Sequence, residues 1–323
     1  MAELIIFVIA LFAAIRGADW LGKASITVAK NYNVPPFVIG ATLVSLATTL
    51  PELTIAFFSG NVSKNPLYGL GAVLGSPIIN LGLILGILFI VSQTRPALGY
   101  YSRSVNIFIL LSVALFLVSL YRPIGGIVSV ILILSGFAYL FLEFTINQRQ
   151  PSFFENLENR FEKFISFFHL AGDKTLVLEF VAGAMLLAVG CKFLVDSGVA
   201  LANSFGVHDF YISTMVLAIG TSLPELFTMI NSVMKKRVGL SAGNLIGASV
   251  IDITIGVGLA TLTIPTTIPL PYALLFFVTI IALGITCLIA LFRNISLTLV
   301  GGLLVSFAVS FIILLTIKEF VSF

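Results

Sequence analysis

Long apolar runs alternate with short polar breaks along this chain, and each run is long enough to cross a bilayer. A transmembrane helix needs about 20 largely apolar residues. The expected spans are residues 3–29, 35–60, 66–92, 101–121, 124–145, 175–201, 208–234, 239–264, 270–292 and 295–317. The pattern therefore predicts an all-α polytopic membrane protein with ten transmembrane helices.

The two halves of the chain resemble each other. A shift of 173 positions sets the run from Thr48 to Leu53 on the run from Thr221 to Leu226. About five predicted spans precede the second copy, so the second half enters the membrane with opposite polarity, as in many secondary transporters. We expect residues 1–145 to form a first five-helix repeat, 146–174 a cytoplasmic linker with an amphipathic helix, and 175–323 an inverted second repeat.

Composition excludes a water-soluble domain. Hydrophobic residues make up 59% of the chain and charged residues only 10%, which is too few to cover a soluble surface. The net charge of +3 is spread over loops and leaves no footprint for nucleic acid. An outside N-terminus would leave only Lys64, Arg122 and Lys318 in the outer loops, so the positive-inside rule predicts a multi-pass protein of the cell membrane with both termini extracellular.

Each repeat carries a glutamate where a bilayer normally forbids a charge. Glu52 and Glu225 lie inside apolar runs, and each directly follows a proline. A charged side chain at membrane depth costs at least ~2.5 kcal/mol, so each acid needs a partner or faces a polar cavity. Pro51 and Pro224 have no N–H and clash with the carbonyl four residues back. We therefore expect both helices to break beside the acid and to free backbone oxygens there.

Further oxygen ligands are expected from the third and eighth spans. Ser76 lies four residues before Asn80, hence on the same helix face, and Asp252 stands at the position that corresponds to Asn80 in the second repeat. With the glutamates these residues form an all-oxygen set without Cys or His, which selects Ca²⁺, Na⁺ or Mg²⁺ over zinc or copper. Calcium fits best, because it accepts about six to eight oxygens in flexible geometry.

Three acids close together must be neutralised, because like charges in a low-dielectric site otherwise bind protons. One divalent ion, several monovalent ions or protons could do this. Competition among these cations for the same acids is a physical basis for antiport.

Two other charged pairs are expected to be structural. Asp19 and Lys23 lie four residues apart in the first span, and Lys192 and Asp196 lie at equivalent places in the sixth with the signs exchanged. This spacing puts each pair on one helix face, where the two charges satisfy each other.

At its two motifs the sequence resembles the calcium/cation antiporter superfamily, and within it the sodium/calcium exchanger branch. The first repeat reads Ala-Thr-Thr-Leu-Pro-Glu from Ala47 and Gly-Ala-Val-Leu-Gly-Ser from Gly71, and the second reads Gly-Thr-Ser-Leu-Pro-Glu from Gly220 and Gly-Asn-Leu-Ile-Gly-Ala from Gly243. The resemblance implies a ten-helix exchanger that moves Ca²⁺ against Na⁺ by alternating access, with the first and sixth helices sliding across the others.

The resemblance also implies roles for single residues. Glu52 and Glu225 would bind Ca²⁺ with the carbonyls of Thr48 and Thr221, and Asn80 and Asp252 would complete the middle of the site. The sodium sites would be formed by Ser76, Thr49, Ser222 and the carbonyls of Ala47 and Ala218.

The sequence departs from the family pattern in three places. Ala72 stands where the first repeat usually has Asn, Thr49 replaces a usual Ser, and Ala248 replaces a Ser that would match Ser76. Losing the hydroxyl at position 248 is expected to weaken one sodium site, unless Ser249 or a water replaces it. Neither motif carries the glutamate of the proton/calcium exchangers, and Asn80 in place of Asp disfavours potassium dependence.

The expected partners are thus Ca²⁺, with Na⁺ or H⁺ as counter-ion, and the lipid bilayer. A H⁺/Ca²⁺ or broader cation antiporter is the alternative, and a passive cation channel is a less favoured one, because channels need weak, multi-site binding. The chain has no histidine pair for a metal, no Gly-x-Ser-x-Gly motif and no phosphate loop, so we expect neither an enzyme nor a cofactor.

Overall fold

The computed structural model describes residues 2–31, 34–61, 66–95, 98–145, 174–204, 219–292 and 294–321, which are almost wholly helical. The helices, including three π-helical segments (η), are α1 (Ala2–Asn31), α2 (Pro36–Ile39), η1 (Gly40–Val44), α3 (Ser45–Thr48), α4 (Leu50–Asn61), α5 (Pro66–Pro77), η2 (Ile78–Ile84), α6 (Leu85–Ser92), α7 (Leu98–Tyr121), α8 (Ile127–Thr145), α10 (Lys174–Ser204), α12 (Leu223–Met234), α13 (Val238–Ile251), η3 (Asp252–Gly256), α14 (Val257–Ala260), α15 (Leu270–Ile289) and α16 (Leu297–Val321). An isolated β-bridge joins Ile124 and Thr266.

Within the described residues six helices are long and apolar enough to span a membrane, and a seventh span is formed if the bent pair Pro36–Thr48 and Leu50–Phe58 is counted as one. These seven lie within or close to the predicted ranges. The long helices α1 and α10 cover two more predicted ranges but carry charged residues along their length. The predicted span 208–234 is described only from residue 219, and the expected linker lies outside the described residues except for Lys174.

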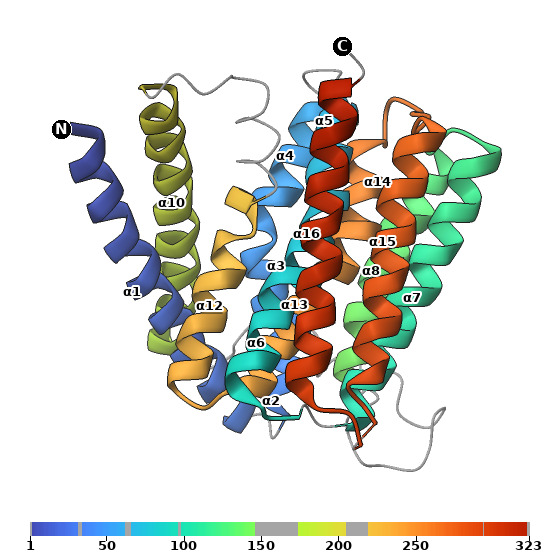
Figure 1. The fold of residues 1–323 in the computed structure, drawn as a ribbon. Coiled ribbons are helices and arrows are strands. Elements are labelled where there is room, and N and C mark those ends of the chain that lie inside the picture. Colours follow the sequence, from blue (N-terminus) through green and yellow to red (C-terminus); the bar gives the residue numbers. More distant parts are fainter. Residues whose placement is uncertain are drawn as a thin grey trace.

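Two continuous helices form the centre of the molecule. The helix from α5 through η2 to α6 is 83% buried over its most apolar window, and the helix from α13 through η3 to α14 is 94% buried. The windows of α7, α8, α15 and α16 are only 28–39% buried, so these helices present most of their surface outward (Figure 1). Their exposed side chains are largely Leu, Ile, Val and Phe, as expected for a surface in lipid.

The α1 and α10 helices pack against each other along one side (Figure 1). Gly190 faces Ala14, whereas Gly183 faces Leu21. Residue numbers thus rise along α10 where they fall along α1, so the two helices are antiparallel. Small residues let the two backbones approach closely, as in many membrane helix pairs. Asp19 on α1 forms the predicted ion pair with Lys23, at 2.9 Å between Nζ and Oδ2, and also pairs with Lys235.

Two of the three π-helical segments, η2 and η3, interrupt the central helices at related places. A π-helical turn is rare and occurs often at functional sites, because it displaces the helix and frees backbone groups. The η2 segment contains Asn80 and η3 begins at Asp252, the two residues that correspond in the repeats. The η1 segment lies just before α3 and packs against α13.

Close packing of η1 on α13 depends on a glycine. A Cβ built on Gly247 would lie 2.5 Å from the carbonyl oxygen of Ala41, a backbone atom that cannot move aside cheaply. Gly239 on the same helix is open, since the nearest atom to its Cβ would be 3.9 Å away.

We expect Gly247→Ala to lower the free energy of unfolding by about 1–3 kcal/mol, because it overpacks this contact. Gly239→Ala is the matched control and should leave stability unchanged or raise it by up to about 1 kcal/mol. Thermal unfolding of the two purified variants in detergent measures the difference. Equal melting temperatures would contradict the close approach.

Candidate functional site

Both predicted helix breaks occur, at equivalent residues. In the first repeat, the helical segments Pro36–Thr48 and Leu50–Phe58 meet at a bend of 45°. Thr49 at this break has φ −81° and ψ −5°, and Ser222, its counterpart before α12, has φ −84° and ψ 3°. Glu52 and Glu225 therefore lie in the first turns of α4 and α12. A carboxylate there is favoured by the positive end of the helix dipole.

The three acids and Asn80 are buried without compensation. Glu52, Glu225, Asp252 and Asn80 are at most 1% exposed. All six carboxylate oxygens and Oδ1 of Asn80 lack a hydrogen-bond partner among the described residues. A buried charge without a partner is strongly unfavourable, so these oxygens need a cation or protons.

A fourth buried acid shows that this lack of partners is local to the site. Glu143 on α8 is also fully buried, but Arg103 on α7 binds it through two hydrogen bonds, with Nη2 3.0 Å from Oε1 and Nε 3.3 Å from Oε2. Among the described residues, the fold thus supplies a counter-charge to the buried acid outside the candidate site and none to the acids inside it.

Hydroxyl groups from one repeat lie beside the acids of the other. Thr221 interacts with Glu52, and Thr48 interacts with Glu225, although neither has full hydrogen-bond geometry. Ser76 lies in the same way beside Asp252. The acids also repel one another, since the negative charges of Glu225 and Asp252 act on the carboxylate of Glu52. The structure thus brings acids from both halves of the chain close enough to repel one another.

The remaining expected ligands are buried in the same region, with one exception. Ser76 accepts a hydrogen bond from Nδ2 of Asn80 at 3.1 Å, which leaves the amide oxygen of Asn80 available. Thr49 donates its hydroxyl to the carbonyl of Ser45 at 2.6 Å. Ala47 and Ser222 are buried, whereas Ala218 lies outside the described residues.

No three side chains of His, Cys, Asp or Glu in the described part of the chain lie close enough together to hold a metal ion. An ion bound here would therefore take many of its ligands from hydroxyls and main-chain carbonyls. Pro51 supports this, because it has no N–H to offer to the carbonyl of Ala47. Carbonyl and carboxylate oxygens are suitable ligands for Ca²⁺ and other hard cations.

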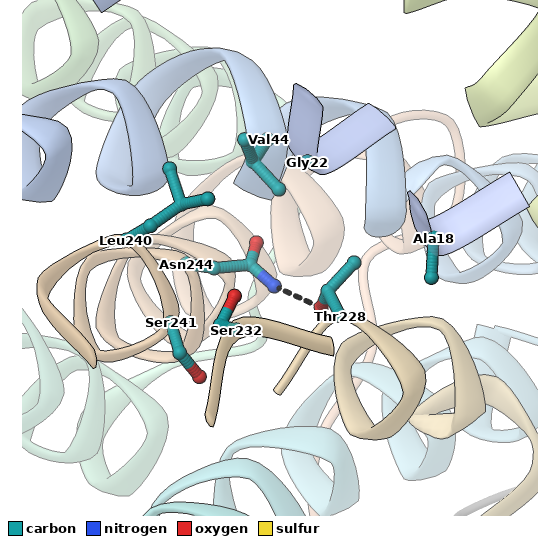
Figure 2. A pocket seen from close by; sticks show the side chains of 8 residues that line it. All are labelled: Ala18, Gly22, Val44, Thr228, Ser232, Leu240, Ser241 and Asn244. Atoms are coloured by element: carbon teal, nitrogen blue, oxygen red, sulfur yellow. Dashed lines mark hydrogen bonds between the residues drawn. The ribbon is translucent and has the colours of Figure 1, made fainter. Parts of the chain in front are cut away.

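Two polar residues of this region have no role in the sequence-based interpretation. Asn244 on α13 accepts a hydrogen bond from Thr48 at 3.1 Å and donates one to Thr228 on α12 at 3.0 Å. It also lines a small cavity with Thr228, Ser232 and Ser241, as Figure 2 shows. The Gly-Asn-x-x-Gly motif was the signal for Asn244, but no sequence feature shows which residues an amide contacts.

The chain is similar to known membrane proteins over nearly its whole length. The family model described as "Sodium/calcium exchanger protein" matches residues 2–155 and 175–318. The "Sodium/calcium exchanger MaX1" of Methanosarcina acetivorans is 24% identical over 349 aligned positions, which cover 96% of this chain and 97% of that protein. The "Inner membrane protein YrbG" of Escherichia coli K12 is 29% identical over 276 positions, covering 83% of this chain and 82% of the relative.

The fold is similar to that of solved structures of the sodium-calcium exchanger NCX_Mj. One of them has a TM-score of 0.79 at 22% identity, with 96% of this chain and 97% of that chain covered. The helical arrangement in Figure 1 is thus the fold of these solved structures.

The uncompensated acids predict an unusual response to mutation. Glu52→Gln should raise the free energy of unfolding by about 1–3 kcal/mol in buffer without Na⁺ or Ca²⁺, because it removes a buried charge that has no partner. Glu143→Gln is the matched control and should lower it, since Arg103 loses its counter-charge. Thermal unfolding at alkaline pH measures both changes. A loss of stability in both variants would contradict the account.

Proposed function

This chain belongs to the sodium/calcium exchanger protein family, and on that premise we propose that it exchanges Ca²⁺ for Na⁺ across the membrane by alternating access. It is a transporter and not an enzyme. The observation that carries the proposal is the group of three buried acids whose oxygens have no partner among the described residues. Such a site is stable only when cations neutralise it, and two kinds of cation that compete for it are exchanged.

The proposed calcium ligands are those that the resemblance implies. Glu52 and Glu225 would bind Ca²⁺ with the carbonyls of Thr48 and Thr221, and Asn80 and Asp252 would complete the site. Burial of these side chains and the crossed neighbourhoods of Thr48 and Thr221 support the assignment.

Na⁺ is the proposed counter-ion. The sodium ligands would be Ser76, Thr49, Ser222 and the carbonyls of Ala47 and Ala218. Relatives over nearly the full length are sodium/calcium exchangers by name, which favours Na⁺ over H⁺. The hydroxyl of Ser249 donates to the carbonyl of Leu245 at 2.8 Å along its own helix, as that of Thr49 donates to Ser45. Its oxygen keeps lone pairs for an ion, whereas the methyl group of Ala248 offers none.

We also propose ten transmembrane helices in two inverted repeats, residues 1–145 and 175–323, joined by a cytoplasmic linker at 146–174. The antiparallel packing of α1 and α10 supports inversion, as do the matching backbone angles at Thr49 and Ser222. The excess of basic residues in the expected inner loops supports a cell-membrane protein with both termini extracellular. The transported ions are substrates, and no cofactor is proposed.

The proposal predicts calcium uptake driven by sodium alone. Proteoliposomes loaded with Na⁺ and diluted into Na⁺-free buffer should accumulate ⁴⁵Ca²⁺, and a matched set with only a pH gradient should not. Accumulation driven only by the pH gradient would replace Na⁺ with H⁺. Calcium equilibration without any gradient would indicate a channel, because a channel cannot concentrate an ion at the expense of another.

Two variants control this measurement. Glu225→Gln removes a charge and an oxygen from the proposed calcium site, so uptake should fall to the level of empty liposomes. Glu179→Gln changes an exposed carboxylate on α10 and should transport like the wild type. Normal uptake by Glu225→Gln would overturn the site assignment.

A further inference from the structure

A chain of three hydrogen bonds joins the two repeats beside Glu225, and Figure 2 shows its middle bond, between Asn244 and Thr228. Thr48 donates to Oδ1 of Asn244 at 3.1 Å, Nδ2 of Asn244 donates to Thr228 at 3.0 Å, and Thr228 donates to the main-chain oxygen of Glu225 at 2.8 Å. All four residues are at most 5% exposed. The chain therefore begins beside the carboxylate of Glu225 and ends at its backbone.

The direction of each bond follows from the last one. A hydroxyl carries one proton, and that of Thr228 is used on the carbonyl of Glu225. Thr228 must then accept from Asn244, and only the NH₂ group of an amide can donate. The amide oxygen therefore turns to Thr48, so Thr48 must donate its own proton to Asn244. None of these three hydrogen bonds therefore leaves a donor for the carboxylate of Glu225. Both of its oxygens indeed lack a hydrogen-bond partner among the described residues.

We propose that Asn244 is a positioning residue for ion binding, which draws the hydroxyl proton of Thr48 away from Glu225. The hydroxyl oxygen of Thr48 then presents its lone pairs to the ion, in addition to the main-chain carbonyl of Thr48, and the carboxylate of Glu225 keeps its full charge for the ion. Without Asn244 the nearest alternative acceptor within the helix is the carbonyl of Ser45, at a long 3.4 Å. The proton of Thr48 would then turn to Glu225 and compete with the cation.

The first repeat has no amide at the equivalent position. Ala72 occupies the position in the first repeat that corresponds to Asn244, and it is buried. A methyl group accepts no proton, so a hydrogen bond of this kind does not form at position 72.

The inference rests on the proposed function and is tested by a double-mutant cycle. Asn244→Leu replaces the amide by an apolar group of similar shape, and Thr48→Val removes the hydroxyl. The readouts for the purified full chain are the calcium affinity, from the rise in melting temperature with Ca²⁺, and the KM for Ca²⁺ in sodium-driven uptake. Asn244→Leu should weaken calcium binding about tenfold, the size expected for one buried hydrogen bond near a charge.

The expected signature is that Asn244→Leu has little further effect once Thr48 is Val, because the amide acts through that hydroxyl. Equal losses of affinity with and without the Thr48 hydroxyl, or no loss at all, would overturn the inference. Thr228→Val removes the acceptor that fixes the orientation of the Asn244 amide, so the amide is free to turn around. This variant should also weaken calcium binding. It therefore tests the role of Asn244 if Asn244→Leu does not fold.

Ser241→Ala is the matched control. Ser241 lies one turn before Asn244 on α13, lines the same cavity and has no hydrogen-bond partner for its hydroxyl among the described residues. The calcium affinity of the Ser241→Ala variant should equal that of the wild type. Failure of the wild type to bind or take up Ca²⁺ would count against the proposed function, whereas wild-type behaviour of Asn244→Leu would count against this inference alone.

Discussion

Burial of three carboxylates without a fixed counter-charge is the constraint on which this structure depends. The protein pairs Glu143 with Arg103 but provides no such partner, among the described residues, for Glu52, Glu225 and Asp252. A resident arginine would make the site stable and useless for transport. Leaving the charges uncompensated makes the site dependent on a mobile cation, and any cation of suitable size and charge competes for the same oxygens.

The interruptions of the helices follow from the same constraint. A continuous helix satisfies its own carbonyls and offers none to an ion, so the helices that carry the acids must break or bulge. Prolines break α3 from α4 and precede Glu225 in α12, and π-helical turns hold Asn80 and Asp252. The π-helical segments are largely buried, so protein and not lipid surrounds them.

The sequence predicts those features of the fold that a local rule decides. Apolar length predicted the spans that the structure describes, and the missing N–H of Pro51 and Pro224 predicted the breaks. The π-helical turns had no such signal, because tertiary packing selects them. The contacts of Asn244 were equally hidden, since Thr48 lies 196 residues away along the chain. Spacing and repeat can thus predict which polar side chains are buried in one region, but not the hydrogen bonds that orient them.

Equilibrium binding of ⁴⁵Ca²⁺ to the purified protein at increasing Na⁺ concentration tests most directly whether Na⁺ and Ca²⁺ compete for the buried acids. Bound calcium should fall as Na⁺ rises, and more steeply than in proportion to Na⁺, because one monovalent ion cannot neutralise acids that held a divalent one. Excess Ca²⁺ should restore binding. Calcium binding that is indifferent to Na⁺ would contradict the account.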